Sequence, residues 1–193
     1  CKNTHFANTN GLWKKDHYTT AYDMSLIGRA AIRNSDFKTI AGTRTYVMSK
    51  TNKNKRGKNE PLANHHKMIN PADYPQYEYE YCEGGKTGYT SKSRNTLVTF
   101  AKKGDMELVC TVMKCDNSVW MEPNAYTDTT KLFNYCFEKY HKVKIADHAA
   151  SEVNEQYLFT NFSPFYSKNT SSLHIDEDAG LILPKGVTID KAE

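Results

Sequence analysis

The feature that most constrains the fold is a run of three β-prone segments that follow one another closely, at residues 79–90, 95–103 and 106–114. Short connectors made of turn residues, with the sequences SKSR and GD, separate these segments. Strands joined by so few residues pair as antiparallel neighbours, because a parallel pair needs a long crossover connection. The sequence therefore predicts a three-stranded antiparallel meander.

A helix is predicted before the meander, at residues 19–34, where apolar side chains recur at helical spacing. Thr20 followed three residues later by Asp23 is typical of a capped helix start. Asn34 and Ser35 are expected to end this helix.

The other segments carry shorter signals. A helix is predicted at 122–140, because a proline lies in its first turn and apolar residues follow at helical spacing. A short strand is predicted at 43–49, and a second one within 61–69. The turn-rich stretches 5–18 and 70–75 are expected to be loops.

The character of the chain changes after His141, where short, polar, β-prone pieces replace the helical and meander patterns. We therefore expect one domain at residues 1–141 and part of a small β-rich domain at 142–193. The N-terminal sequence CKNTHFANTN has no methionine and no signal-peptide pattern. It resembles the interior of a protein, so the chain is expected to be incomplete.

Composition excludes several classes of protein. Aromatic residues make up 12% of the 193 residues, which argues against a disordered polymer. The 26 basic and 22 acidic side chains give a net charge of +4, too small to argue for nucleic-acid binding. No run of 18 apolar residues occurs, so no membrane-spanning helix is predicted. The basic run between Lys50 and Lys58 is interpreted as a solvated loop, with attraction of anionic polymers as the alternative.

The five cysteines do not form a recognisable framework. Their number is odd and no CxxC pair occurs, so neither a disulfide scaffold nor a zinc knuckle is indicated. Cys110 and Cys115 lie in one predicted strand at an odd separation, which places them on opposite faces of that strand. We expect the cysteines to be small buried hydrophobic residues.

Three stretches of the chain resemble one family in matching order. Residues 3–32 are similar to the loop and helix that follow the second active-site motif of the low-molecular-mass penicillin-binding proteins, the serine D-alanyl-D-alanine carboxypeptidases. Residues 84–113, beginning GGKTGYT, resemble the third motif of that family and the two strands behind it. The ending at 181–193 looks like part of the β-rich C-terminal domain of the same proteins.

The resemblance implies a fold and a set of site residues. The expected fold is mixed α/β (α+β), an antiparallel sheet packed by helices, of the β-lactamase and transpeptidase type. Lys86 would supply a positive charge to the substrate carboxylate, and Thr87 a hydroxyl. Gly88 would let the substrate backbone lie along the strand, and the backbone N–H of Tyr89 would be one oxyanion donor.

The chain departs from the family in its first two motifs, S-x-x-K and S-x-N, which supply the nucleophile and base. Ser35 and Lys38 have the first spacing but follow the helix that should come after both motifs. Ser93–Asn95 and Ser167–Asn169 have the second spacing but come after K-T-G. We reject these matches. The chain is expected to contain no catalytic residue of its own, because both motifs should lie upstream of Cys1.

A second departure precedes the K-T-G strand, where the family often has an Asn-x-Asn-like stretch with Arg or Thr near the substrate carboxylate. This sequence has Asn64-His65-His66 there. His65 is therefore a candidate carboxylate contact, and a plain surface histidine pair is the alternative. Adjacent histidines lack the i, i+4 spacing of helical metal ligands, so these two histidines do not predict a zinc site. The resemblance implies an enzyme that needs no metal and no organic cofactor.

The resemblance implies an extracytoplasmic enzyme, membrane-associated as a complete protein, that removes the terminal D-alanine of peptidoglycan stem peptides and is acylated by β-lactams. One alternative is a non-catalytic wall-binding or structural fragment of the same fold. Another is a serine β-lactamase, which shares K-T-G but would not continue into a β-rich domain. Because the missing half would leave apolar surface exposed, we expect a second chain carrying it, an oligomer, or a proteolytic nick.

Overall fold

The computed structural model describes residues 1–53, 61–116, 124–144 and 180–187. It divides into two compact units, Cys1–Phe137 and Glu138–Glu193, which are treated separately below. In chain order the elements are α1 (Ala21–Ala31), α2 (Ser35–Gly42), β1 (Thr45–Tyr46), β2 (Leu62–Ala63), the 3₁₀ turns η1 (Lys67–Ile69) and η2 (Pro75–Tyr77), β3 (Cys82–Thr90), β4 (Arg94–Lys103), β5 (Met106–Cys115), α3 (Asn124–Lys139), β6 (Tyr140–Lys144) and β7 (Gly180–Pro184).

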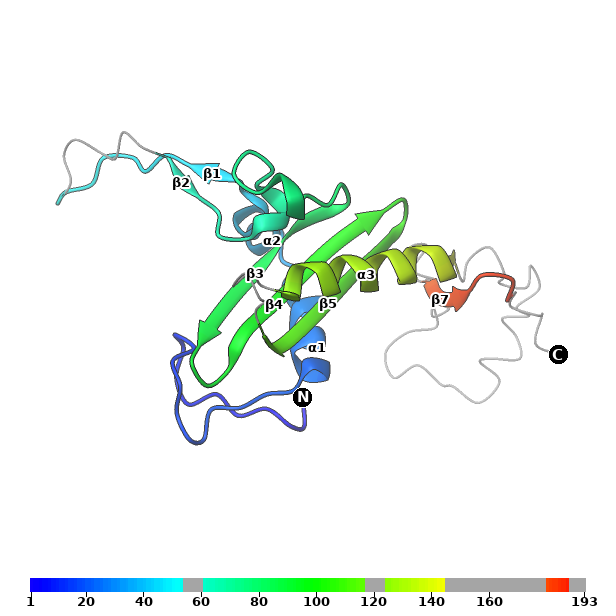
Figure 1. Cartoon of the computed structure of the whole chain (residues 1–193), viewed down its shortest axis with the longest axis horizontal. Coiled ribbons are helices and arrows are strands. Elements are labelled where there is room, and N and C mark those ends of the chain that lie inside the picture. Colours follow the sequence, from blue (N-terminus) through cyan, green and yellow to red (C-terminus); the bar gives the residue numbers. More distant parts are fainter. Residues whose placement is uncertain (54–60, 117–123, 145–179, 188–193) are drawn as a thin grey trace, which may run out of the picture. The chain divides into compact units, whose positions relative to one another are not determined.

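The central sheet of the first unit is the meander β3-β4-β5, and both pairings are antiparallel (Figure 1). The three-stranded antiparallel meander predicted from the short connectors is confirmed. In the β3–β4 register Lys86 lies opposite Val98, and in the β4–β5 register Thr99 lies opposite Cys110. Strand β4 is therefore the buried centre of the sheet, and β3 and β5 are its edges within the described residues.

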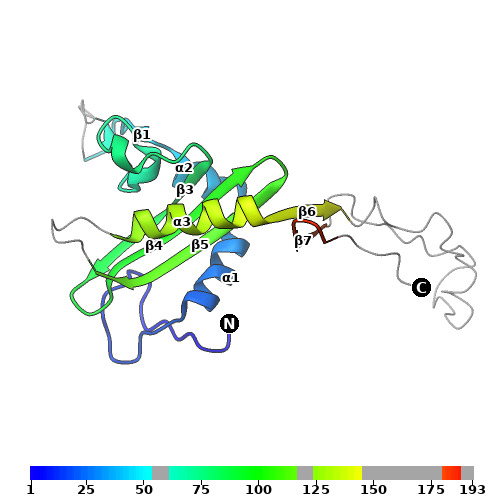
Figure 2. The ribbon, with the colours of Figure 1, turned by 45° about the vertical axis from the view of Figure 1, so that its right-hand side comes forward.

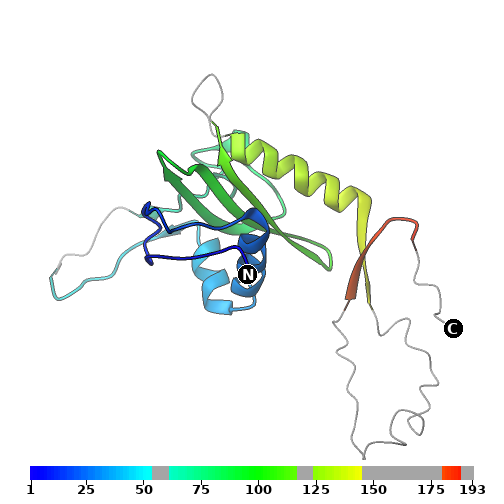
Figure 3. The ribbon, with the colours of Figure 1, turned by 90° about the horizontal axis from the view of Figure 1, so that it is seen from below.

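Helices cover both faces of this sheet, with α3 on one side and α1 and α2 on the other (Figure 3). Alternate residues of β4 divide between these sides. Leu97 packs in the cluster that contains Ala125 and Tyr126 of α3. Phe100 faces the other way, with its ring 6.4 Å from the ring of Phe37 on α2. The expected class, an antiparallel sheet packed by helices, is confirmed.

The helix predicted at 19–34 is confirmed as α1, but it ends earlier than expected and a second helix, α2, which was not predicted, follows it. Helix α1 stops at Ala31, and Ser35 begins α2 instead of ending α1. The side chain of Asn34 accepts a hydrogen bond from the backbone N–H of Phe37 at 2.8 Å. Asn34 is thus an N-cap, the start signal of a second helix. The predicted start of α1 is confirmed, because the Thr20 hydroxyl accepts from the N–H of Asp23.

Strands β1 and β2 form a small separate ladder, with Thr45 opposite Ala63 and Tyr46 opposite Leu62. The strand predicted at 43–49 was too long. All four paired residues are exposed, so the ladder has no core face to extend it. The second strand predicted within 61–69 is confirmed at Leu62–Ala63.

Helix α3 is confirmed over Asn124–Lys139, and the expected start at residues 122–123 lies outside the described residues. Its buried side chains recur at helical spacing and face the sheet: Ala125, Tyr126, Thr129, Phe133 and Phe137.

The prediction that Cys110 and Cys115 occupy opposite faces of β5 was wrong. The thiol of Cys110 lies 4.0 Å from the hydroxyl of Thr129, and that of Cys115 lies 3.9 Å from the carboxylate of Asp128, so both contact α3. The register of β4 and β5 shifts near their ends, and Lys114 has a φ of 53°. A bulge of this kind adds a residue to one strand and reverses the alternation beyond it.

In the second unit, β6 and β7 pair antiparallel, with Lys142 opposite Ile182 (Figure 2). The remainder of the sequence expected to form the β-rich domain, including Ser167 and Asn169, lies outside the described residues.

Candidate functional site

A pocket of about 360 Å³ lies where α2, the segment after β2 and the K-T-G strand meet. Its lining comes from three parts of the first unit: Phe37, Ile40 and Ala41 of α2, then Ala63, Asn64 and His65, then Gly85, Lys86 and Thr87 of β3. The structure thus brings together three of the five residues expected from the sequence, Lys86, Thr87 and His65.

Lys86 and Thr87 lie side by side on β3, at the edge of the sheet. Lys86 is exposed, and its ammonium donates a hydrogen bond to the carbonyl oxygen of Thr87 at 2.6 Å. The Thr87 side chain is half-buried. A cation beside a hydroxyl, on a strand with one open edge, suits the binding of a carboxylate and a peptide backbone.

Gly88 and Tyr89 continue β3 beyond the pocket lining. A Cβ at Gly88 would lie 2.5 Å from the Oγ1 of Thr96, whose hydroxyl donates to the Gly88 carbonyl at 3.1 Å. The Tyr89 side chain is 68% exposed. No described strand pairs with the outer edge of β3. The role of the Tyr89 N–H as an oxyanion donor stays a prediction.

Asn64 joins the segment after β2 to the end of α2. Its side-chain amide donates to the carbonyl oxygens of Ala41 and Thr43, at 3.1 and 2.9 Å, where α2 ends. Its Oδ1 accepts from the backbone N–H of His66 at 2.9 Å. Asn64 therefore satisfies free carbonyls at the end of α2 and orders the histidine segment with the same side chain.

The two adjacent histidines have different environments. His65 is exposed at the pocket, whereas His66 is 1% exposed and its Nε2 lies 2.9 Å from the Oγ1 of Thr99. Burial, with a smaller contribution from the nearby charge of Lys86, lowers the pKa of His66 from 6.5 to about 4. His66 is therefore a neutral imidazole at pH 7, and it packs against the backbone of Gly85.

Lys67 is held by a cage of three tyrosines. Its ammonium lies 4.6 Å from the ring centroid of Tyr74, 5.1 Å from that of Tyr77 and 5.9 Å from that of Tyr126. The Tyr126 hydroxyl also donates to the carbonyl of His65 at 3.4 Å. The cage thus fixes the segment that presents His65 to the pocket.

Residues of the rejected S-x-x-K and S-x-N matches have structural roles. Lys38 is ion-paired with Glu83 and Glu107, at 2.7 and 2.5 Å. Burial alone would lower the pKa of Lys38, but hydrogen bonds and charges from the two carboxylates raise it, so Lys38 is a poor general base for Ser35. Ser93 bonds the hydroxyl of Thr90 at 2.7 Å within the β3–β4 turn.

Among the described residues, no group of three or more His, Cys, Asp or Glu side chains is placed to hold a metal ion. In the same part of the chain, no helix has the length and apolar character that crossing a membrane requires.

The solved structures to which this chain is similar include DD-peptidases. A D-alanyl-D-alanine carboxypeptidase from Mycobacterium tuberculosis superimposes with a TM-score of 0.58 and 27% identity, covering 71% of this chain and 48% of that one. The DD-transpeptidase of a Streptomyces strain gives a TM-score of 0.57 and 28% identity, covering 70% and 48%. The fold and the K-T-G strand therefore define a transpeptidase-like protein, as expected from the resemblance.

Sequence comparison identifies the family within this class. The model of the D-alanyl-D-alanine carboxypeptidase family, Peptidase_S11, matches residues 1–117. DacF of Bacillus subtilis is 31% identical over 140 residues, which is 72% of this chain and 32% of that protein. DacA of Escherichia coli K12 is 29% identical over 185 residues, or 96% and 40%. The chain belongs to the D-alanyl-D-alanine carboxypeptidase family, and it spans about a third to two fifths of these two relatives.

Sequence reasoning missed the α2 wall of the pocket and the roles of Asn64, His66 and Lys67. The Asn34 cap followed by Phe37 and Ile40 was an available signal for α2. Nothing in the sequence distinguishes the buried His66 from the exposed His65.

Proposed function

We propose that this chain carries the K-T-G part of the active site of a serine D-alanyl-D-alanine carboxypeptidase. The observation that carries the proposal is that Lys86, Thr87 and His65 line one pocket at the open edge of β3. The first two come from the meander, and His65 is presented by the segment after β2. Family membership supports the substrate class, a peptide that ends in D-alanyl-D-alanine.

Each residue has a defined task in the proposed reaction. The Lys86 ammonium binds the terminal carboxylate, with Thr87 and His65 as hydrogen-bonding neighbours. The substrate lies along β3 past Gly88, where no Cβ stands in its way. Its scissile carbonyl oxygen then meets the backbone N–H of Tyr89, which stabilises the negative charge that develops there.

The covalent step needs a serine and a lysine, and no residue of this chain is assigned to either task. The serine oxygen adds to the carbonyl carbon while the lysine takes its proton, the C–N bond breaks, and D-alanine leaves with a proton. Water then hydrolyses the ester. A β-lactam acylates the same serine as its ring amide opens. We place the complete enzyme outside the cytoplasm, associated with the membrane, with peptidoglycan as its partner.

The test is to join this chain to a family segment that carries S-x-x-K and S-x-N, and to record the intact mass before and after incubation with a penicillin. The expected result is a mass increase equal to that of the drug. The same fusion with its serine changed to alanine is the control, and it should gain no mass. A folded fusion that gains no mass would overturn the catalytic assignment and favour a non-catalytic wall-binding role.

A further inference from the structure

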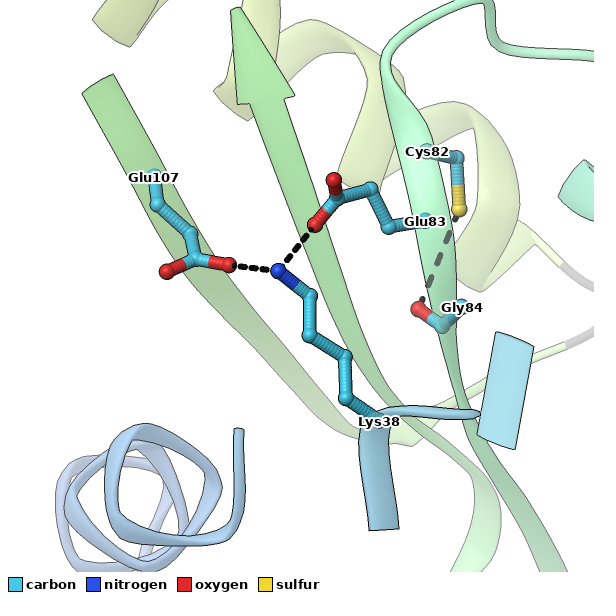
Figure 4. Close-up of polar contacts among 5 residues, drawn as sticks. All are labelled: Lys38, Cys82, Glu83, Gly84 and Glu107. Atoms are coloured by element: carbon cyan, nitrogen blue, oxygen red, sulfur yellow. Dashed lines mark hydrogen bonds and ion pairs between the residues drawn. The ribbon is translucent and has the colours of Figure 1, made fainter. Parts of the chain in front are cut away.

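Lys38 links α2 to both edges of the central sheet (Figure 4). Its ammonium lies 2.7 Å from a carboxylate oxygen of Glu83 on β3 and 2.5 Å from one of Glu107 on β5. The three side chains are each about one third exposed, at 32%, 34% and 33%. One lysine therefore spans the width of the meander, from its first strand to its last.

Glu83 reaches Lys38 because the β3–β4 ladder is irregular at this point. The register shifts between Cys82 and Gly84, so Glu83 lies in a bulge three residues before Lys86. Its side chain points from β3 toward Lys38 in Figure 4. A bulge commonly redirects a side chain in this way.

The backbones of α2 and β3 are in direct contact beside this ion pair. A Cβ at Gly42 would run into the carbonyl oxygen of Glu83, and a Cβ at Gly84 would lie 2.7 Å from the carbonyl oxygen of Ala41. Two glycines thus permit the close approach. The next residues on each side, Ala41 and Gly85, line the pocket.

We propose that Lys38 is a positioning residue that sets the separation between the α2 wall and the β3 wall of the pocket. Holding Glu83 fixes the start of the K-T-G segment against the end of α2. Holding Glu107 stops α2 from rolling across the sheet. The effect of this separation on peptide binding rests on the proposed function.

The first test needs no ligand. It measures backbone amide resonances in the pocket wall that does not carry the substitution, which is β3 for a change in α2 and α2 for a change in β3. In Lys38→Met the backbone amide resonances of Gly85 and Thr87 should shift, although both lie far from position 38 in sequence. In Glu83→Gln the amide resonances of Ile40 and Ala41 should shift in turn. Lys38→Arg keeps the charge and should restore the wild-type spectrum. Lys131→Met, which removes an exposed lysine of α3, is the matched control and should leave all four resonances unchanged.

The second test measures the dissociation constant for an acetylated peptide that ends in D-alanyl-D-alanine, using the full chain. Lys38→Met should raise it by roughly threefold to tenfold, and Lys38→Arg should not. If Lys38→Met fails to fold, the dissociation constant of Glu83→Gln tests the same ion pair from the β3 side.

The outcomes separate the two proposals. Opposite-wall resonances that stay in place in every folded variant would overturn the positioning role, whatever happens to the peptide affinity. A wild-type chain that binds no peptide would contradict the proposed function, while the resonances would still decide the role of Lys38.

Discussion

The imidazole of His66 and the hydroxyl of Thr99 meet at 2.9 Å against the K-T-G strand, and both side chains are at most 1% exposed. His66 has a pKa of about 4 when folded, against the ordinary 6.5, because burial disfavours its charged form. Between these values the unfolded chain binds more protons than the folded chain. The contribution of neutral, buried His66 to the free energy of unfolding is therefore complete above pH 6.5, and it decreases as the pH falls toward 4.

This difference predicts a pH-dependent stability. Between pH 7 and pH 4 the free energy of unfolding should fall by up to about 3 kcal/mol through His66. Urea unfolding of wild type and His66→Gln at several pH values measures the effect, and the variant should show the shallower fall. His65→Gln, which changes the exposed neighbour, should behave as wild type. Equal slopes for wild type and His66→Gln would contradict the prediction.

Lys86→Ala should weaken binding of a D-alanyl-D-alanine peptide to the chain. Losing a charge-assisted hydrogen bond costs about 1.5–3 kcal/mol, which is roughly a tenfold to hundredfold rise in the dissociation constant. Calorimetric titration of the peptide measures this change. Lys92→Ala removes an exposed lysine from the nearby turn and should leave the affinity as it is. Equal losses in both variants would point to a general charge effect.

Gly85→Ala should destabilise the first unit by about 1–3 kcal/mol. The new Cβ would lie 2.8 Å from the His66 ring and closer still to the carbonyl oxygen of Val98, which belongs to the β4 backbone and cannot turn away. Gly88→Ala meets only the Thr96 hydroxyl, which can rotate, so its cost should be smaller. Thermal unfolding of both variants checks this order, and a reversed order would show that the β3–β4 contact is looser than described.

Lys67→Met should lose about 1 kcal/mol of stability, because it removes the cation from the cage of Tyr74, Tyr77 and Tyr126. Lys67→Arg keeps a cation at the rings and should retain most of this stability. Urea unfolding measures both, with Lys131→Met as the control for loss of one exposed lysine charge. A Lys67→Met variant as stable as wild type would mean that the cage contributes nothing to stability.

The cysteines should react with a thiol reagent in a fixed order. Cys1 is exposed, whereas burial raises the pKa of Cys82 to about 12 and that of Cys110 to about 11. At pH 8 these two thiols are almost entirely protonated, so Cys1 should be labelled well before either of them. Mass spectrometry after timed alkylation measures the order. All five should react in guanidinium, and early labelling of Cys82 in the native chain would contradict its burial.

The sequence predicted the meander and its position because short turns between β-prone segments leave one pairing pattern. It also predicted that Lys86 and Thr87 would lie together, since they are neighbours on one strand. Placing His65 beside them depended on the family resemblance, because contacts between separate segments are set by packing that no local pattern records.

The features that the sequence predicted wrongly or not at all have physical causes at a few residues. Asn34 has the same short polar side chain whether it ends one helix or caps the next, so α2 was missed. At Lys114 one residue with positive φ reversed the faces of the cysteines. The different burial of His65 and His66 follows from the Asn64 bridge and from the cage around Lys67, both of which depend on partners distant in sequence.

The open edge of β3 also has a consequence for self-association. An exposed strand edge that can receive an extended peptide can equally receive the same edge of a second copy, and long bare edges of this kind are sites of aggregation. Lys86 is exposed on this strand, and its charge would have to approach that of its counterpart if two copies paired here in register. Lys86, which is proposed to attract a carboxylate, would thus also disfavour pairing of β3 with β3 of a second copy.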